Sequence, residues 1–278
     1  RPEAYHETLR QFEAGSGGDS GGGGGSGGAG GSGGGAPDVP ESIHGVVRVK
    51  ESGLTARIAY DRYERRSGLV RVLGYEVTAD DWAQARAVDL GDAVDGAFGL
   101  ADLAPGRLVA TRDATLAGAA VRVVRTLTLG GDRRTPMLEL LVELEHRDGP
   151  PLDARIGLEW STTMLGGGGN PAAWWEAAGE RTGHDVGGSA TDLTSIAQGN
   201  DHVGVTVTTT ADAPAEAWWA PIETISNSEG GFERVYQGSG LLLSWPVRLG
   251  PGEHWSRMVR HVVTTAVDRT ADEVVSQP

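Results

Sequence analysis

Two stretches of strict alternation restrict the folds open to this chain. Every even-numbered position from 138 to 144 carries leucine or valine, and the odd-numbered positions mostly carry glutamate. The even-numbered positions from 152 to 160 are likewise apolar. A period of two is typical of antiparallel strands that bury one face and expose the other. We therefore expect Asp153, Arg155 and Glu159 to point outward, into solvent.

Further strands are predicted along the rest of the chain, and no segment has the pattern of a βαβ unit. The predicted strands are 44–50, 55–60, 67–77, 107–111, 120–129, 203–209, 215–221, 241–247 and 254–265. We expect 51–53 to join the first two as a hairpin, 78–86 to form a helix capped by Thr78, and 165–200 to be a long Gly-rich excursion. The fold class is all-β, as a large antiparallel β-sandwich.

Three segments differ in composition. Tyr5, Leu9 and Phe12 recur at helical spacing, so residues 1–14 are predicted to be the helical remnant of a preceding domain with little to pack against. Residues 15–37 are almost all Gly and Ser, apart from Asp19, two alanines and Pro37, which favours a disordered flexible linker over 15–41. Residues 42–278 are predicted to form the sandwich. Because the chain begins without Met, we expect it to be a fragment.

Charge and composition narrow the function. The net charge of −14 argues against nucleic acid or an anionic membrane as a partner, because both attract basic surfaces. The chain has no cysteine, and no apolar run approaches the roughly 20 residues that span a bilayer. The first residues are too polar for a signal peptide. We expect a cytoplasmic protein.

The segment 221–238 is the most unusual part of the chain. It is too polar for a core strand and too rich in hydrogen-bonding groups for a simple linker, and Gly230-Gly231 predicts a sharp turn. We interpret it as a working or docking loop that faces a sugar polymer or a catalytic domain. Its predicted site residues are Glu223, Glu229, Phe232, Glu233, Arg234, Tyr236 and Gln237.

Two tryptophan pairs precede this loop. Trp174-Trp175 lies among glycines and could offer flat apolar faces to a sugar, with packing against a neighbouring domain as the rival interpretation. Trp218-Trp219 lies in a predicted strand, so one ring should face the core and the other, Trp219, should face outward. We include Trp174, Trp175 and Trp219 among the predicted residues for carbohydrate binding or domain docking.

Catalytic and metal chemistry have weaker support. Glu229 and Glu233 could reach the spacing of a glycosidase carboxylate pair, but ion pairing of one of them with Arg234 or Arg257 is the favoured interpretation. The histidines fit no zinc spacing, and no Gly-x-Ser-x-Gly sits at a predicted strand-to-helix turn. We predict no catalytic residue, no metal site and no cofactor.

Several segments resemble the C-terminal domain of glycoside hydrolase family 57 enzymes, the α-amylase and 4-α-glucanotransferase type. The matching segments are 42–54, 60–63, 91–98, 156–161 and 222–238, and 92–97 departs from the family pattern. The resemblance implies a galactose-mutarotase-like supersandwich and a role in α-glucan metabolism. It also implies that the family's catalytic carboxylates, a Glu nucleophile and an Asp acid/base, lie in an N-terminal (β/α) barrel. No residue of this chain can be matched to them.

Three functional hypotheses follow. The first is a non-catalytic C-terminal β-sandwich that supports the barrel, its expected partner, and that in one version also binds α-glucan. The second is a mutarotase-like epimerase with Glu229 or Glu233 as base and His44 or His184 as acid, which requires a His and a Glu in one pocket. The third is a structural spacer without a ligand.

Overall fold

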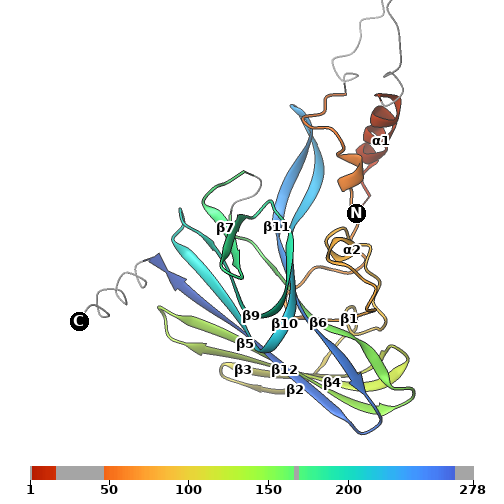
Figure 1. Ribbon diagram of the computed structural model, residues 1–278, viewed down its shortest axis with the longest axis vertical. Coiled ribbons are helices and arrows are strands. Elements are labelled where there is room, and N and C mark those ends of the chain that lie inside the picture. The colour runs from red at the N-terminus through yellow and green to blue at the C-terminus, as the bar shows by residue number, and fades with distance from the viewer. Residues whose placement is uncertain (1, 17–46, 166–168, 267–278) are drawn as a thin grey trace, which may run out of the picture. The chain divides into compact units, whose positions relative to one another are not determined.

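A computed structural model describes residues 2–16, 47–165 and 169–266 (Figure 1). The predicted linker over 15–41, apart from its first two residues, lies outside the described residues, and so does His44. The chain divides into two compact units: residues 1–60 with 224–235, and residues 61–223 with 236–278.

The larger unit is built on one antiparallel sheet. It runs in the order β1-β6-β11-β10-β12-β5-β4-β3-β2, with β9 beside β10, β7 beside β9 and β8 beside β7, twelve strands in all. The strands are β1 (Leu69–Leu73), β2 (Gly99–Ala104), β3 (Arg107–Leu116), β4 (Ala119–Gly131), β5 (Pro136–Asp148), β6 (Leu152–Thr162), β7 (Ala173–Ala177), β8 (Glu180–Gly183), β9 (Gly188–Asn200), β10 (Val205–Ser228), β11 (Gly231–Leu249) and β12 (His254–Thr265). The predicted all-β antiparallel class is confirmed.

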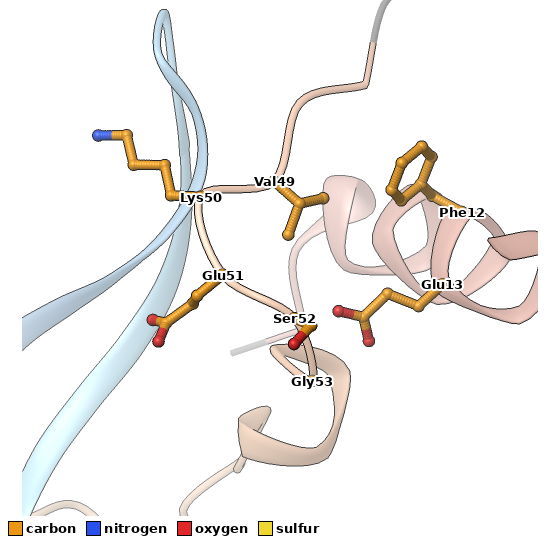
Figure 2. Close-up of a pocket in the computed structure, with 7 residues that line it drawn as sticks. All are labelled: Phe12, Glu13, Val49, Lys50, Glu51, Ser52 and Gly53. Atoms are coloured by element: carbon orange, nitrogen blue, oxygen red, sulfur yellow. The ribbon is translucent and has the colours of Figure 1, made fainter. Parts of the chain in front are cut away.

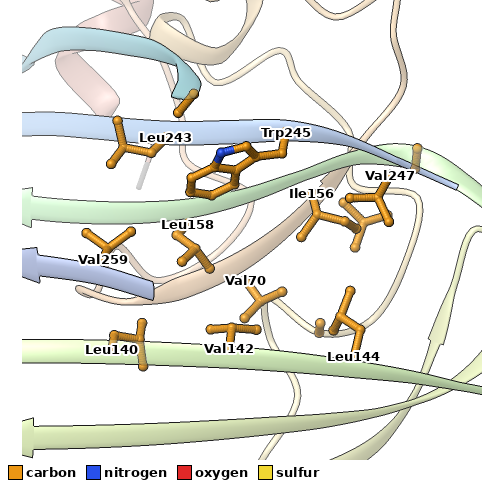
Figure 3. Packing of buried hydrophobic residues seen from close by; sticks show 14 of the residues in the cluster. Val70, Leu140, Val142, Leu144, Ile156, Leu158, Leu243, Trp245, Val247 and Val259 are labelled. Carbon is orange, nitrogen blue, oxygen red and sulfur yellow. The ribbon is translucent and has the colours of Figure 1, made fainter. Parts of the chain in front are cut away.

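The core lies between two layers of this sheet. Apolar rows from β6 and β11 pack with those of β4 and β5 in a single buried cluster. Figure 3 shows Ile156 and Leu158 of one layer directed toward Leu140 and Val142 of the other. Strand β10 lies between β11 and β12 in the strand order, so it joins the two layers. The alternation read from 138–144 and 156–160 therefore identified the buried face correctly.

The outer face of β6 departs from prediction at Glu159, which is 0% exposed rather than solvated. Its carboxylate accepts hydrogen bonds from the Tyr63 hydroxyl, at 2.8 and 2.9 Å, and from the Trp82 indole nitrogen, at 2.8 Å. It also pairs with Arg71, which is 1% exposed. Trp82 belongs to helix α2 (Ala79–Ala83), so the segment that carries this helix covers the strand. One-sided alternation could not reveal that second cover.

Two further predictions concern loops. Helix α2 forms where predicted, although shorter, and Thr78 and Asp81 complete a capping box at its start. The predicted excursion over 165–200 is wrong, because it contains strands β7, β8 and β9. Strand β9 pairs along β10 from Asn200 to Gly188 with two register shifts. Its polar sequence gives no alternation, so only the pairing with its neighbours reveals the strand.

The smaller unit consists of helix α1 (Ala4–Ser16), the segment 47–60 and the end of the β10–β11 hairpin. The predicted hairpin over 44–60 is wrong in its described part. Residues Thr55–Arg57 form the 3-10 helix η2. The carboxylate of Glu13 accepts hydrogen bonds from the backbone nitrogens of Leu54, at 3.0 Å, and Thr55, at 3.1 Å. Helix α1, through Glu13, thus provides hydrogen bonds to backbone nitrogens that a neighbouring strand would bind in a hairpin.

A small core holds this unit together and corrects the expectation that the helix lacks a packing partner. Leu9 is fully buried with Leu54, Ile225 and Phe232. His6 is within hydrogen-bonding distance of the Ile225 carbonyl at 3.1 Å. Of the helix face predicted from periodicity, Leu9 and Tyr5 therefore pack against the segment 47–60 and the hairpin, whereas Phe12 stays exposed. No described helix of either unit is long and apolar enough to cross a membrane.

A buried histidine in the larger unit makes stability depend on pH. His261 is 8% exposed, and its Nδ1 lies 2.8 Å from the Thr209 hydroxyl. Burial lowers the pKa of His261 from 6.5 to about 4. As the pH falls below 6.5, His261 therefore takes up a proton in the unfolded chain but stays neutral in the folded chain. The contribution of neutral His261 to the free energy of unfolding is fully present above pH 6.5. About 3 kcal/mol of it is lost when the pH falls to the pKa of the folded chain, about 4.

This pH dependence is measurable by denaturant unfolding at a series of pH values. The variant His261→Gln is expected to lose that part of the slope between pH 6.5 and about 4. The same substitution at His254, which is exposed, should leave the slope as it is in the unaltered chain. Equal slopes in the His261 variant and the unaltered chain would contradict the assignment.

Candidate functional site

The polar segment 221–238 forms the end of the β10–β11 hairpin and not a loop, so that prediction is corrected. The turn itself is at Glu229-Gly230, and Gly231 has a φ of +106°, as expected for a sharp turn at the paired glycines. A Cβ on Gly231 would lie 2.5 Å from the Arg48 carbonyl oxygen. Glycine is therefore required here because another piece of backbone passes close by.

The neighbouring backbone is the segment that begins at residue 47. Val49 pairs with Phe232 in a parallel bridge. The Phe232 nitrogen donates to the Arg48 carbonyl at 2.8 Å, and the Lys50 nitrogen donates to the Phe232 carbonyl at 3.0 Å. These hydrogen bonds place residues 48–50 beside the hairpin as a short parallel neighbour of β11. They also fix the backbone positions of the charged side chains next to Val49 and Phe232.

Two ion pairs hold this contact. Glu233 pairs with Lys50, and the Arg234 Nε donates to Glu51 at 2.6 Å. The hydrogen bond from Lys50, together with one from Ser228, lowers the pKa of Glu233. The favoured interpretation of Glu233 as a structural ion pair is therefore right, but its partner is Lys50 and not an arginine. The sequence contains a signal for these two ion pairs. Lys50-Glu51 is a basic residue followed by an acidic one, and Glu233-Arg234 has the reverse order, so the two dipeptides are complementary in charge.

The remaining predicted residues of the hairpin divide between interior and surface. Phe232 is 2% exposed and belongs to the core of the smaller unit, so it is not a surface contact residue. Glu229 and Gln237 are exposed, and Glu223 is partly buried. Glu229, Glu233 and Arg234 lie in the smaller unit. Apart from these three and Phe232, the predicted site residues belong to the larger unit.

A surface pocket adjoins this contact in the smaller unit. It has a volume of ≈ 530 Å³ and is lined by Phe12, Glu13 and the residues 49–53 (Figure 2). Figure 2 shows Phe12 and Val49 on opposite sides of the opening. Phe12 is 39% exposed. The pocket thus combines apolar walls with the ionisable side chains of Glu13, Lys50 and Glu51.

The first tryptophan pair is buried in strand β7. Trp174 is 4% exposed, its indole nitrogen donates to Asp201 at 2.9 Å, and the Arg181 guanidinium lies 3.8 Å from its ring centroid. Trp175 is 1% exposed and stacks on His184 with ring centroids 5.2 Å apart. The predicted glycine-rich loop with an exposed aromatic platform is therefore wrong, since neither ring presents a face to solvent.

The second pair is buried as well. Trp218 and Trp219 point to opposite faces of β10, as the alternation of a strand requires, but they are 2% and 9% exposed. Trp219 belongs to the main core, and Trp218 packs with Trp82 in a separate cluster. The prediction that Trp219 faces outward is wrong because both faces of the sheet are covered at this point.

His184 and Tyr236 meet in a buried polar cluster. The His184 Nε2 lies 2.9 Å from the Trp174 carbonyl, which can only accept, so Nδ1 accepts from the Ser239 hydroxyl, at 2.9 Å, or the Tyr236 hydroxyl, at 3.1 Å. Burial lowers the pKa of His184. The hydrogen bonds of His184 within the described residues involve no carboxylate. Among those residues, His184 thus has no hydrogen bond to the Glu229 or Glu233 named in the epimerase hypothesis, and His44 lies outside them.

These features define a two-layered, antiparallel all-β domain whose aromatic side chains are largely internal. A family model described as alpha-amylase/4-alpha-glucanotransferase, C-terminal, matches residues 1–258, and the chain belongs to this family. The family resemblance recognised in the sequence is confirmed.

The relatives are longer proteins. A stretch of 58 residues, 21% of this chain and 8% of the relative, is 43% identical to alpha-amylase 1 of Dictyoglomus thermophilum. The crystal structure of 4-alpha-glucanotransferase from Thermococcus litoralis matches 74% of this chain with a TM-score of 0.57 at 19% identity. The chain spans 28% of that enzyme's length. This structural similarity bears on the fold alone.

Proposed function

We propose that the chain is the non-catalytic C-terminal β-sandwich of an α-glucan-acting hydrolase or 4-α-glucanotransferase, and that it supports the catalytic barrel of that enzyme. The observation that carries the proposal is the family match over residues 1–258. The proposed partner is the catalytic domain. In this role the domain contributes a rigid neighbour and no reacting group.

The smaller unit supplies the proposed docking surface. An apolar centre with a charged rim is typical of protein interfaces, and the pocket beside Phe12 has this composition. The adjacent exposed Glu229 adds charge at the hairpin end. The ion pairs of Glu233 and Arg234 fix the backbone around them, which limits the side-chain ordering that association costs.

The evidence for direct binding of a glucan chain is weaker than the evidence for a structural role beside the catalytic barrel. Sugars bind to the faces of aromatic rings, and the tryptophans proposed for this purpose are all internal. Of the predicted site residues in the larger unit, Gln237 is exposed and Tyr236 is partly buried. We propose these two as the remaining contacts for a glucan chain that leaves the catalytic domain.

Association with the barrel can be measured by calorimetry, with the catalytic domain expressed separately. Phe12→Glu is expected to weaken the complex at least tenfold, about 1.4 kcal/mol, because it places a charge in the apolar part of the pocket. Leu100→Glu is the matched control, since Leu100 is 61% exposed on β2 of the larger unit. A Phe12 variant that binds as tightly as the control would remove the docking surface from this pocket.

A further inference from the structure

One arginine of the larger unit points into the sandwich and forms no ion pair with any described residue. On β4 the buried Val121 and Val123 occupy the inward face, and Arg125 is the next residue on that face. It is paired in register with Val142 of β5, another core residue. A charged side chain thus stands in a row that is otherwise apolar.

The surroundings of Arg125 do not neutralise it. No carboxylate in the described part of the chain forms an ion pair or a hydrogen bond with its guanidinium, which lies 4.9 Å from the ring centroid of Phe98. Burial lowers the pKa of Arg125, although a guanidinium stays charged at neutral pH. Arg71, by contrast, has two carboxylate partners. A desolvated charge without a counter-ion is unfavourable unless a ligand supplies one.

Arg125 faces a pocket. The cavity has a volume of ≈ 370 Å³ and is lined by Arg125, Phe98, Ser67 and the residues around them in 64–69 and 93–97. No ion pair between described residues joins Arg125 to the acidic side chains of this lining, since Glu64 pairs with Arg66 and Asp95 is exposed without a contact to the guanidinium. The loop over 92–97, which departs from the family pattern, forms one wall.

A second cavity borders the first, since Ser67 lines both. It has a volume of ≈ 280 Å³, and its lining is apolar apart from Ser67, Thr162, Trp160 and His261. The Trp160 Nε1 and the His261 Nε2 are buried and have no hydrogen-bond partner within the described residues. A Cβ on Gly68 would lie 3.2 Å from an Arg125 nitrogen and 3.7 Å from the Trp160 ring, so the two side chains converge there.

We propose that these two neighbouring cavities together bind a small anionic ligand whose carboxylate or phosphate group pairs with Arg125. Arginine suits both groups because its planar fork donates two parallel hydrogen bonds. Phe98 packs along the other side of the guanidinium and holds it in place. The unpartnered nitrogens of Trp160 and His261 provide hydrogen bonds for the uncharged part of the ligand, which is the size of a sugar acid or a sugar phosphate. This inference is independent of the proposed docking to a barrel.

The test is a calorimetric titration of the full chain with glucose 1-phosphate, glucuronate, inorganic phosphate and neutral glucose. We expect saturable binding of at least one charged sugar and at least tenfold weaker binding of glucose. Preference for glucose 1-phosphate identifies a phosphate site, and preference for glucuronate identifies a carboxylate site. Inorganic phosphate binding as well as both sugars would reveal an adventitious ion only and would overturn the proposal.

Arg125→Gln should reduce the binding of the charged sugar at least tenfold, while Arg107→Gln, at a surface ion pair with Asp102, should not change it. Because Arg125 lacks an ion pair, its loss should leave the melting temperature unchanged or higher in the absence of ligand. Arg125→Lys keeps the charge without the fork and should bind with intermediate affinity, which provides a second test if the glutamine variant does not fold. Absence of binding by any anion, or binding that survives Arg125→Gln, would overturn the proposal.

Discussion

Replacing Arg71 with methionine is expected to lower the free energy of unfolding of the larger unit by about 3–5 kcal/mol. Arg71 is 1% exposed, and its Nη2 lies 2.8 Å from Asp89. Its Nη1 pairs with Glu159, which is fully buried. Methionine fills much of the same volume but leaves two buried carboxylates without their cation, and that desolvation penalty dominates the effect.

The network around Arg71 explains why the loss should be large. Burial alone would lower the pKa of Arg71, but the charges of Glu159 and Asp89 overcome it and raise the pKa above its ordinary value. Burial and the charge of Glu159 raise the pKa of Tyr63, so its hydroxyl stays protonated and donates to that carboxylate. The carboxylates of Asp89 and Glu159 both depend on the Arg71 guanidinium to balance their negative charge.

Chemical denaturation provides the measurement, with Arg122→Met as the matched control. Arg122 pairs with Asp113 at 3.0 Å, but these side chains are 34% and 78% exposed, so its loss should cost at most about 1 kcal/mol. A similar small loss in both variants would show that the buried network contributes no more than a surface ion pair.

Replacing Phe232 with alanine is expected to destabilise the smaller unit by about 3–5 kcal/mol, close to the whole stability that so small a core can supply. Phe232 is 2% exposed and packs with Leu9 of helix α1 and with Leu54. A helix of this length is marginal in water unless tertiary packing stabilises it. The helix should therefore fray in the variant, while the sandwich remains folded.

Amide hydrogen exchange of residues 4–16 distinguishes this local effect from global unfolding. Protection of the helix should fall in Phe232→Ala and stay unchanged in strands β5 and β6. Phe12→Ala is the control within the same unit, since Phe12 is 39% exposed and its truncation removes less buried surface. Equal protection of the helix in the two variants would contradict the role assigned to Phe232.

The sequence predicts the sandwich core well because alternation at 138–144 and 156–160 reports directly on burial. It does not predict strand β9, whose polar residues are ordered by pairing with β10 and not by a buried stripe. Glu159 has the same pattern as a solvated glutamate, and only Tyr63, Trp82 and Arg71, distant in sequence, explain its burial.

The candidate site was predicted only in part. Gly230-Gly231 identified the turn, and the neighbouring charges identified a structural ion pair. The local pattern places Lys50 and Glu51 in a hairpin, although they pair with residues more than 180 positions away. The tryptophans were misassigned because local composition indicates whether a residue lies among glycines, but not whether two sheet layers cover it.

The most direct test of the proposed function combines this chain with its catalytic domain, expressed separately, in a maltoheptaose assay. The chain alone should neither hydrolyse nor disproportionate maltoheptaose. It should form a 1:1 complex with the catalytic domain and raise that domain's melting temperature. Product formation by the chain alone, or the absence of any complex and any thermal shift, would contradict its assignment as the supporting C-terminal domain.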